Sequence, residues 1–250
     1  MTSMMLDDPS RYAALVAPAV DRCAISVHPA VDKSAMAALR GEHRFAPQAF
    51  ALFAGTLAAG PISMNEFSEL LRYRHFGSPE TFLNGLVERG AVTVNSDGSF
   101  ETTEAARDVA KQVVELQCAT IDSLWAPRRS SHVGLRVLAD RAVAAAVADD
   151  SVLARYNNRS WLPENASDAA VIWTACVTLR MHRSDAHARA WAERGHTADS
   201  VRELESGAER EAIEARTNEL ASPPWAALTA DERLAFLAGL AALPGTGSPI

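Results

Sequence analysis

Residues 167–193 constrain the fold more than any other stretch, because they follow a helical period without a broad polar face. At about 100° per residue, apolar side chains fill two of the three sectors around such a helix. They are Ile172, Cys176, Leu179, Ala186 and Ala190 in one sector, and Trp173, Val177, Met181, Ala188 and Trp191 in another. A helix that is apolar over most of its circumference is stable only when other elements surround it. The pattern therefore predicts a central helix.

The same helical period continues through most of the 250 residues. Alanine is abundant, aromatic residues make up only 6% of the chain, and apolar residues recur at helical rather than alternating spacing. These features indicate a mainly α protein. The expected helices cover residues 9–23, 31–40, 47–58, 63–73, 78–89, 103–124, 133–156, 167–193, 200–221 and 230–242.

One segment, residues 90–102, departs from the helical period. Two short β-prone runs flank an Asp-Gly pair, which is a hairpin turn signal. Two short helices precede this hairpin and a longer helix follows it, which is the order of a winged helix-turn-helix. We therefore predict a mainly α fold that combines a winged helix-turn-helix with a helical bundle. The expected domains are an N-terminal helical segment (1–46), a winged-helix domain (47–127) and a C-terminal helical domain (128–250), with a linker at Arg128 and Arg129.

The winged-helix segment resembles the MarR-like regulators over residues 48–124. The resemblance lies in Leu-Val-Glu-Arg-Gly at residues 86–90 and in Thr-Thr-Glu-Ala-Ala-Arg at residues 102–107, on either side of the expected wing. Such a module would place the helix from Pro79 in the major groove. Over the same segment, however, five basic residues stand against ten acids, a net charge of −5. Because groove binders gain most of their affinity from neutralising phosphates, we expect a scaffold or dimerisation element here and no nucleic-acid partner.

The whole chain is acidic, with 24 Lys and Arg against 31 Asp and Glu and a net charge of −7, which opposes binding to polyanions. Residues 1–11 carry two aspartates and a proline where an export signal needs a basic stretch and an apolar core. No apolar run reaches the roughly 18 to 20 residues that span a bilayer. Cys23, Cys118 and Cys176 lie far apart without CxxC spacing, so buried free thiols are expected. We therefore expect a cytoplasmic protein without a membrane partner.

Arg183 and His187 are the strongest site candidates, because both fall on an apolar sector of the helix over residues 167–193. The period points them into the interior, where an isolated charge is far too costly. Either protein acids and helix ends or an anionic ligand must compensate them. The first alternative is a structural ion network in which His187 is a neutral core histidine, and the second is a ligand pocket. The sequence leaves both open.

The remaining polar residues of this helix gather on another side, which is expected to face water. His182 and Asp185 are three residues apart, and Asp185 and Arg189 are four apart, spacings that favour solvated surface pairs over catalysis. His182 and His187 lie about 140° apart around the helix, so they cannot share a metal ion. No metal site is expected. The GxGxxG motif of dinucleotide-binding proteins, the P-loop motif and the GxSxG motif of hydrolases are missing from the sequence. The sequence therefore does not identify a cofactor.

Arg216 is a second basic residue on an apolar stripe, which it shares with Ile213 and Leu220 in the helix expected over residues 200–221. Its head group is placed among core-facing residues, or it reaches back to the surface as long arginine side chains do. Two prolines end this helix, and Trp225 is expected to pack over its end.

Two motifs extend the comparison to a second family. HRxDxH at residues 182–187 and EARTxELAxxPW at residues 214–225 resemble an actinobacterial family of helical, largely uncharacterised proteins that also carry a winged-helix segment. By position, the paired motifs of that family fall on Arg180, His182, Arg183, Asp185, His187, Arg216, Thr217, Asn218 and Trp225.

Together these features predict a pocket beside the central helix for a small organic molecule, anionic or polar. In an enzyme, His187 would be the general acid or base, Arg183 would stabilise developing negative charge, and Asp185 or Asn218 would orient them. A ligand-responsive MarR-like transcription regulator is the alternative, and a structural or partner-binding protein is a third class. A homodimer through the N-terminal or winged-helix segment is also expected. The expected catalytic residues are His187, Arg183 and Asp185, and the expected ligand-binding residues are Arg180, His182, Arg216, Asn218 and Trp225.

Overall fold

The computed structural model describes residues 2–42, 60–73, 78–158 and 162–245. In these ranges the chain is mainly helical, with one pair of short antiparallel strands. No helix among the described residues has both the length and the apolar character needed to cross a bilayer. The helix expected over residues 47–58 lies outside the described residues.

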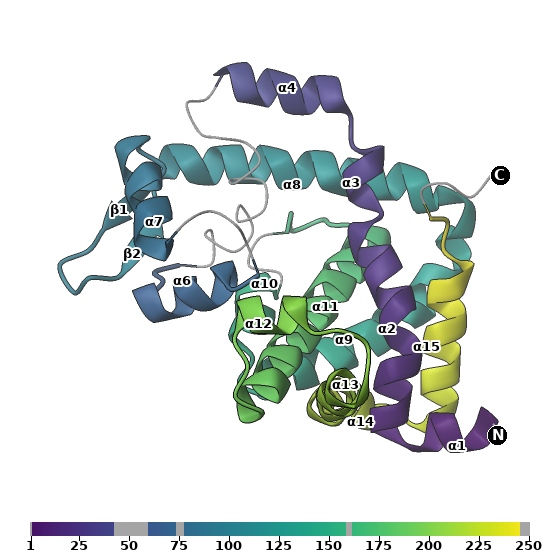
Figure 1. The fold of residues 1–250 in the computed structure, drawn as a ribbon. Helices are drawn as coiled ribbons and strands as arrows, with labels where there is room; N and C mark the ends of the chain where they lie inside the picture. The colour runs from purple at the N-terminus through teal and green to yellow at the C-terminus, as the bar shows by residue number, and fades with distance from the viewer. Residues whose placement is uncertain (1, 43–59, 74–77, 159–161, 246–250) are drawn as a thin grey trace.

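Figure 1 shows the order of the elements from the purple N-terminus to the yellow C-terminus. The N-terminal helices are α1 (Thr2–Asp7), α2 (Pro9–Ile25), α3 (Val27–Ala30) and α4 (Lys33–Glu42). The next elements are α6 (Met64–Leu71), α7 (Pro79–Glu88), β1 (Val92–Val94), β2 (Phe100–Thr102), α8 (Glu104–Trp125) and the 3-10 helix η1 (Ala126–Ser131). The remaining helices are α9 (His132–Ala148), α10 (Val152–Asn157), α11 (Asp168–Glu193), α12 (Ala198–Glu203), α13 (Ala208–Leu220), α14 (Pro223–Ala226) and α15 (Ala230–Ala242).

Helix α11 is the predicted central helix. Ser167 begins it, because the Ser167 Oγ accepts a hydrogen bond from the backbone N–H of Ala170 at 3.1 Å. Gly195, with a φ of +79°, turns the chain after the helix ends. Helices α2, α8, α9, α10 and α13 all pack against α11, and buried residues occur around most of its circumference. The prediction of a surrounded helix is confirmed.

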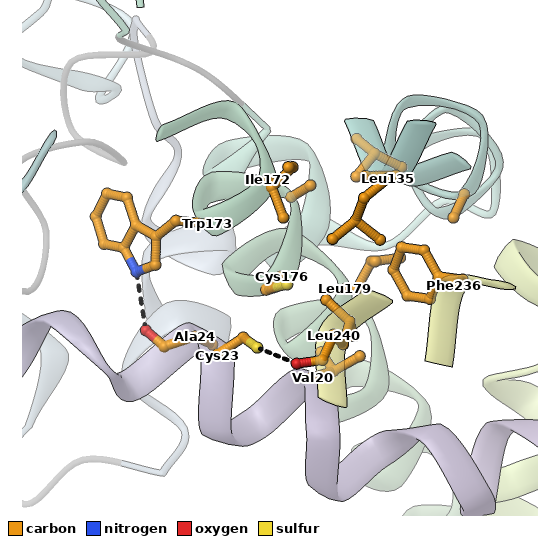
Figure 2. Packing of buried hydrophobic residues seen from close by; sticks show 14 of the residues in the cluster. Val20, Cys23, Ala24, Leu135, Ile172, Trp173, Cys176, Leu179, Phe236 and Leu240 are labelled. Carbon is orange, nitrogen blue, oxygen red and sulfur yellow. Dashed lines mark hydrogen bonds between the residues drawn. The ribbon is translucent and has the colours of Figure 1, made fainter. Parts of the chain in front are cut away.

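The larger core lies where α2, α9, α11 and α15 meet (Figure 2). Val20, Ile172, Leu179 and Phe236 belong to this core, and each is at most 4% exposed. At its edge, the indole Nε1–H of Trp173 donates to the backbone oxygen of Ala24 at 3.1 Å, which joins α11 to α2. All three cysteines are buried free thiols, as the sequence predicts. N-terminal and C-terminal helices thus share one core.

A second core lies under α6, α7 and the hairpin, and α8 is long enough to reach both cores. Phe67 packs edge-on against Phe100, with ring centroids 4.9 Å apart. β1 pairs antiparallel with β2, and Gly98, with a φ of +81°, forms the turn between them. The hairpin that the sequence predicts over residues 90–102 is therefore present.

Two helices that the sequence predicts as continuous are interrupted. The helix expected over 133–156 ends at Ala148, and Asp150, whose φ is +55°, turns the chain. Helix α10 begins after Ser151, whose Oγ accepts from the backbone N–H of Ala154. The helix expected over 200–221 is broken before Gly207, whose φ is +155°. Residues 126–131, expected to include a linker, form η1 directly between α8 and α9.

Candidate functional site

Side chains from α2, α6, α10, α11 and α13, and from the turn after α6, surround a cavity of about 520 Å³, here called the polar cavity. Its lining residues are Asp21, Leu70, Tyr73, Leu153, Arg180, Met181, Arg183, Ser184, His187, Glu214 and Thr217. Most of them carry a polar or charged group. The cavity is therefore suited to a small molecule with several hydrogen-bonding groups.

His187 lies on the wall of the polar cavity with one ring nitrogen held in place. Its Nδ1 lies 3.1 Å from the hydroxyl oxygen of Tyr73, and the two rings stack with centroids 6.2 Å apart. The indole Nε1–H of Trp191 donates to the same hydroxyl oxygen at 3.0 Å. No described residue forms a hydrogen bond with Nε2 of His187. Nε2 is therefore the ring nitrogen left for a ligand.

The hydroxyl of Tyr73 has two acceptors for its own hydrogen. It faces Nδ1 of His187 at 3.1 Å and the backbone oxygen of Ser184 at 3.4 Å. When Tyr73 donates to Nδ1, His187 carries its hydrogen on Nε2 and can donate to a ligand. When Tyr73 donates to Ser184, Nδ1 can keep the hydrogen and Nε2 becomes an acceptor. The arrangement thus lets His187 donate or accept at the cavity.

Burial sets the charge state of this pair. It lowers the pKa of His187, with Glu214 acting in the opposite direction and Arg183 in the same one. Burial also raises the pKa of Tyr73. At neutral pH the imidazole is therefore uncharged and the phenol keeps its hydrogen, which is the state that a general base and its hydrogen-bonding partner require.

Two arginines of α11 border the polar cavity, and each has a carboxylate partner. Arg180 pairs with Asp21 of α2, and Arg183 pairs with Glu214 of α13. Nη1 of Arg183 also donates to Oδ1 of Asn218 at 2.8 Å. The side chain of Arg183 is 23% exposed, so the predicted interior position is reached only in part. The two pairs balance the charge at this border.

The side of α11 that carries His182 and Asp185 is also buried, which corrects the prediction that both face water. His182 is 2% exposed, and its Nε2 lies 3.0 Å from Oδ2 of Asp149. Asp185 accepts hydrogen bonds from Ser151 Oγ at 2.6 Å and from the backbone N–H of Leu153 at 2.8 Å. Helix α10 and the residues before it cover this side, which a helical period cannot reveal. Asp185 does not line the polar cavity.

Arg216 lies at the surface, which is the second of the two placements that the sequence leaves open. Its guanidinium forms two hydrogen bonds with Glu193, at 2.7 and 3.1 Å, and one with Glu219 at 2.9 Å. Its side chain is 42% exposed, whereas Ile213 on the same predicted stripe is buried. The long side chain carries the charge to water. Arg216 therefore does not converge with Arg183 and His187.

A second cavity, of about 400 Å³, borders the same two ion pairs and is here called the apolar cavity. Trp225 forms part of its wall and is only 5% exposed, because it packs edge-on against Tyr12 with ring centroids 5.4 Å apart. The lining residues are Ala13, Ala14, Ala17, Pro18, Val20, Asp21, Leu179, Arg180, His182, Arg183, Glu214, Ala221 and Trp225.

The two histidines of the HRxDxH motif face different partners. His182 meets Asp149, whereas His187 meets Tyr73. In the part of the chain that the structure describes, no group of three or more His, Cys, Asp or Glu side chains is placed to hold a metal ion.

Three residues that line the polar cavity, Tyr73, Asp21 and Glu214, are not predicted as site residues from the sequence. Tyr73 lies 114 positions before His187, and no local spacing connects the two. Trp191, in contrast, follows His187 by one helical turn, so its position was a usable signal.

Comparisons with known proteins found no match to this chain among family models, curated proteins or solved structures. The chemistry of the site therefore rests on its own residues and geometry.

Proposed function

We propose that this chain binds a small polar organic molecule in the polar cavity beside α11. The observation that carries the proposal is the state of His187, whose Nδ1 is held by Tyr73 while Nε2 has no partner among the described residues on the cavity wall. A ring nitrogen fixed in this way can bind a hydroxyl, amine or carbonyl group of a ligand in a defined direction.

The same pair is suited to acid–base chemistry on the bound molecule. A neutral His187 can take a proton at Nε2, and Nδ1–H then donates to the oxygen of Tyr73, whose own hydrogen turns to the backbone oxygen of Ser184. We assign the acid–base role to His187 and the orienting role to Tyr73. Arg183, which already pairs with Glu214, is assigned to ligand positioning.

Of the two ligand classes that the sequence leaves open, we favour the polar one over the anionic one. Arg180 and Arg183 are the cations at the cavity border, and both already have a carboxylate partner. An anionic ligand at either arginine would compete with the carboxylate already paired there and would be repelled by it. A ligand that hydrogen-bonds without net charge leaves both pairs intact.

We also propose that α6, α7, the hairpin and the first half of α8 form a winged helix that acts as a scaffold, rather than a DNA-reading module. Glu80 at the start of α7 and Asp97 at the hairpin tip are exposed, where a DNA-binding module would meet phosphates. Hydrogen bonds from its own backbone and from Ser78 lower the pKa of Glu80, and hydrogen bonds from Ser99 lower that of Asp97. Both are therefore negative at neutral pH.

A mobility-shift assay with a random DNA duplex tests this scaffold proposal. The duplex should show no mobility shift at low salt, and a salt-dependent shift would favour the transcription regulator.

Native mass spectrometry of the purified protein tests the binding proposal, because it reports a co-purified ligand and the number of subunits together. We expect a bound mass of metabolite size in the unmodified protein. The variants Tyr73→Phe and His187→Ala should lose most of it, by about tenfold or more, since each removes a hydrogen bond at the cavity wall.

Matched controls are Tyr156→Phe and His196→Ala, which make the same changes outside both cavities. These controls should keep the bound mass. Retention of the same mass in Tyr73→Phe and His187→Ala, at the level of the controls, would contradict the proposal.

A further inference from the structure

The polar cavity and the apolar cavity share a wall. The residues common to both linings are Asp21, Arg180, Arg183 and Glu214, which are the members of the two ion pairs. The other lining residues differ between the two cavities. One side offers Tyr73 and His187. The other side offers alanines of α2, Trp225 and His182, whose Nε2 already meets Asp149.

We propose that the apolar cavity receives an apolar tail of the same ligand, so that the ligand is an amphipathic molecule without net charge. The inference rests on the proposed function for its head group, which occupies the polar cavity. The ion pairs then lie beside the junction of head and tail.

The walls of the apolar cavity support a tail rather than a second polar group. Ala13, Ala14 and Ala17 present only a methyl group each, so α2 leaves open space where larger side chains would fill it. Trp225 is fixed by its contact with Tyr12, so the cavity has a rigid aromatic side. Apolar groups gain affinity here by leaving water, at about three- to fourfold for each methylene that becomes buried.

The shared wall argues for a ligand without net charge. It carries two arginines and two carboxylates, already matched as Arg180 with Asp21 and Arg183 with Glu214. A charged head group of either sign would find one attractive and one repulsive partner in each pair. A charged head group would therefore gain little at this wall, because the carboxylate or guanidinium of opposite sign already occupies each partner.

The test compares two sets of probes by isothermal titration calorimetry below their micelle-forming concentrations, one that varies the tail and one that varies the charge of the head group. Glucose, hexyl glucoside and octyl glucoside share a head group and differ in the tail. Octanoate and octylammonium keep a tail of similar length and carry opposite charges. We expect octyl glucoside to bind with one site, about tenfold more tightly than hexyl glucoside, and the two charged probes to bind at least tenfold more weakly than octyl glucoside.

Ala17→Phe should fill the apolar cavity and remove the dependence on tail length. Ala145→Phe is the matched control, because it places the same ring at another half-buried alanine, on α9, outside both cavities. Thermal unfolding of both variants checks that they fold. The control should keep the tenfold preference for octyl over hexyl glucoside.

Two results would overturn the inference: no gain in affinity from hexyl to octyl glucoside, including the case in which neither binds, or equal binding of a charged octyl probe. Either result leaves the proposed function standing if Tyr73→Phe and His187→Ala still lose the co-purified mass. Retention of that mass in both variants removes the proposed function itself, whatever the tail dependence.

Discussion

Asp185 accepts hydrogen bonds from two neighbouring elements. It binds Ser151 Oγ at 2.6 Å, the backbone N–H of Leu153 at 2.8 Å and Nη1 of Arg72 at 3.3 Å. These donors come from the start of α10 and the end of α6, so one carboxylate joins both elements to α11. We therefore interpret Asp185 as a structural residue.

Replacing Asp185 with alanine should lower the free energy of unfolding by about 3 kcal/mol, because several buried donors lose their acceptor at once. Urea unfolding measures the change. Asp199→Ala is the control, since Asp199 is 89% exposed and forms a surface pair with Arg202, and it should have a far smaller effect. A small effect of Asp185→Ala, equal to that of the control, would contradict the structural interpretation.

Burial makes three histidines poor proton acceptors in the folded chain. It is the largest cause of the lowered pKa of His132, His182 and His187. Their folded pKa values lie below the unfolded value of about 6.5, so the unfolded chain takes up these protons first as the pH falls. Their stabilising contribution is complete above about pH 6.5 and is lost as the pH falls below it.

The urea midpoint should therefore be lower at pH 5.0 than at pH 7.5. No described residue is hydrogen-bonded to the buried Nε2 of His132, and the ring lies against Trp125 with centroids 6.4 Å apart. The variant His132→Phe keeps this ring contact without the proton-binding site, so it should lose less stability between the two pH values. An identical loss in the variant would exclude His132 from the pH effect.

At the scale of elements, Asp150 separates α9 from α10. Its φ of +55° is the left-handed region, which side chains other than glycine rarely adopt. The break lets Ser151 cap α10 and places Asp149 beside His182. The left-handed conformation of Asp150 thus allows α10 to pack over the side of α11 that carries His182.

Asp150→Val should destabilise the protein by about 1–2 kcal/mol, because a β-branched side chain clashes with the backbone in this conformation. Asp150→Gly should be neutral or stabilising by up to about 1 kcal/mol. Ala148→Val, an exposed position nearby in α9, controls for the valine itself. Urea unfolding of the three variants measures the differences, and equal effects at positions 148 and 150 would contradict the strain argument.

At the scale of the whole molecule, Arg233 connects α15 to the N-terminal helix α1. It is 6% exposed, and its guanidinium donates to the backbone oxygens of Trp225 at 2.8 Å, Leu6 at 2.5 Å and Asp7 at 3.2 Å. Tyr12 donates to the backbone oxygen of Arg233 at 2.6 Å. The partial negative charge at the end of α1 favours the cation there. Helix α15 is thereby fixed to α1, α2 and α14.

Arg233→Met should cost about 3 kcal/mol or more, because it removes a buried guanidinium that donates to three carbonyl groups and joins α15 to α1. Limited proteolysis should release the residues before α2 faster in this variant. Arg155→Met, at an arginine that is 46% exposed, is the matched control. Unchanged unfolding and unchanged proteolysis in Arg233→Met would contradict the role.

The residues of the candidate site were predicted only in part. Arg183 and His187 both line the polar cavity, as their shared helical side suggested. His182 and Asp185 are buried rather than solvated, and Arg216 takes the solvated one of the two placements that the sequence leaves open. A helical period gives the angle between side chains, but it does not say which side another element covers or how far a long side chain extends.

The sequence by itself determined the helical class, the central position of α11 and the hairpin over residues 90–102, since these follow from local periodicity and turn chemistry. Only the tertiary structure decided which side of α11 meets α10, which side leaves a cavity, and that Tyr73 meets His187. The physical reason is the distance along the chain over which each kind of interaction acts. Hydrogen-bonded turns and amphipathic periods act between neighbours along the chain, whereas the cavity walls and ion-pair partners come from helices distant in sequence.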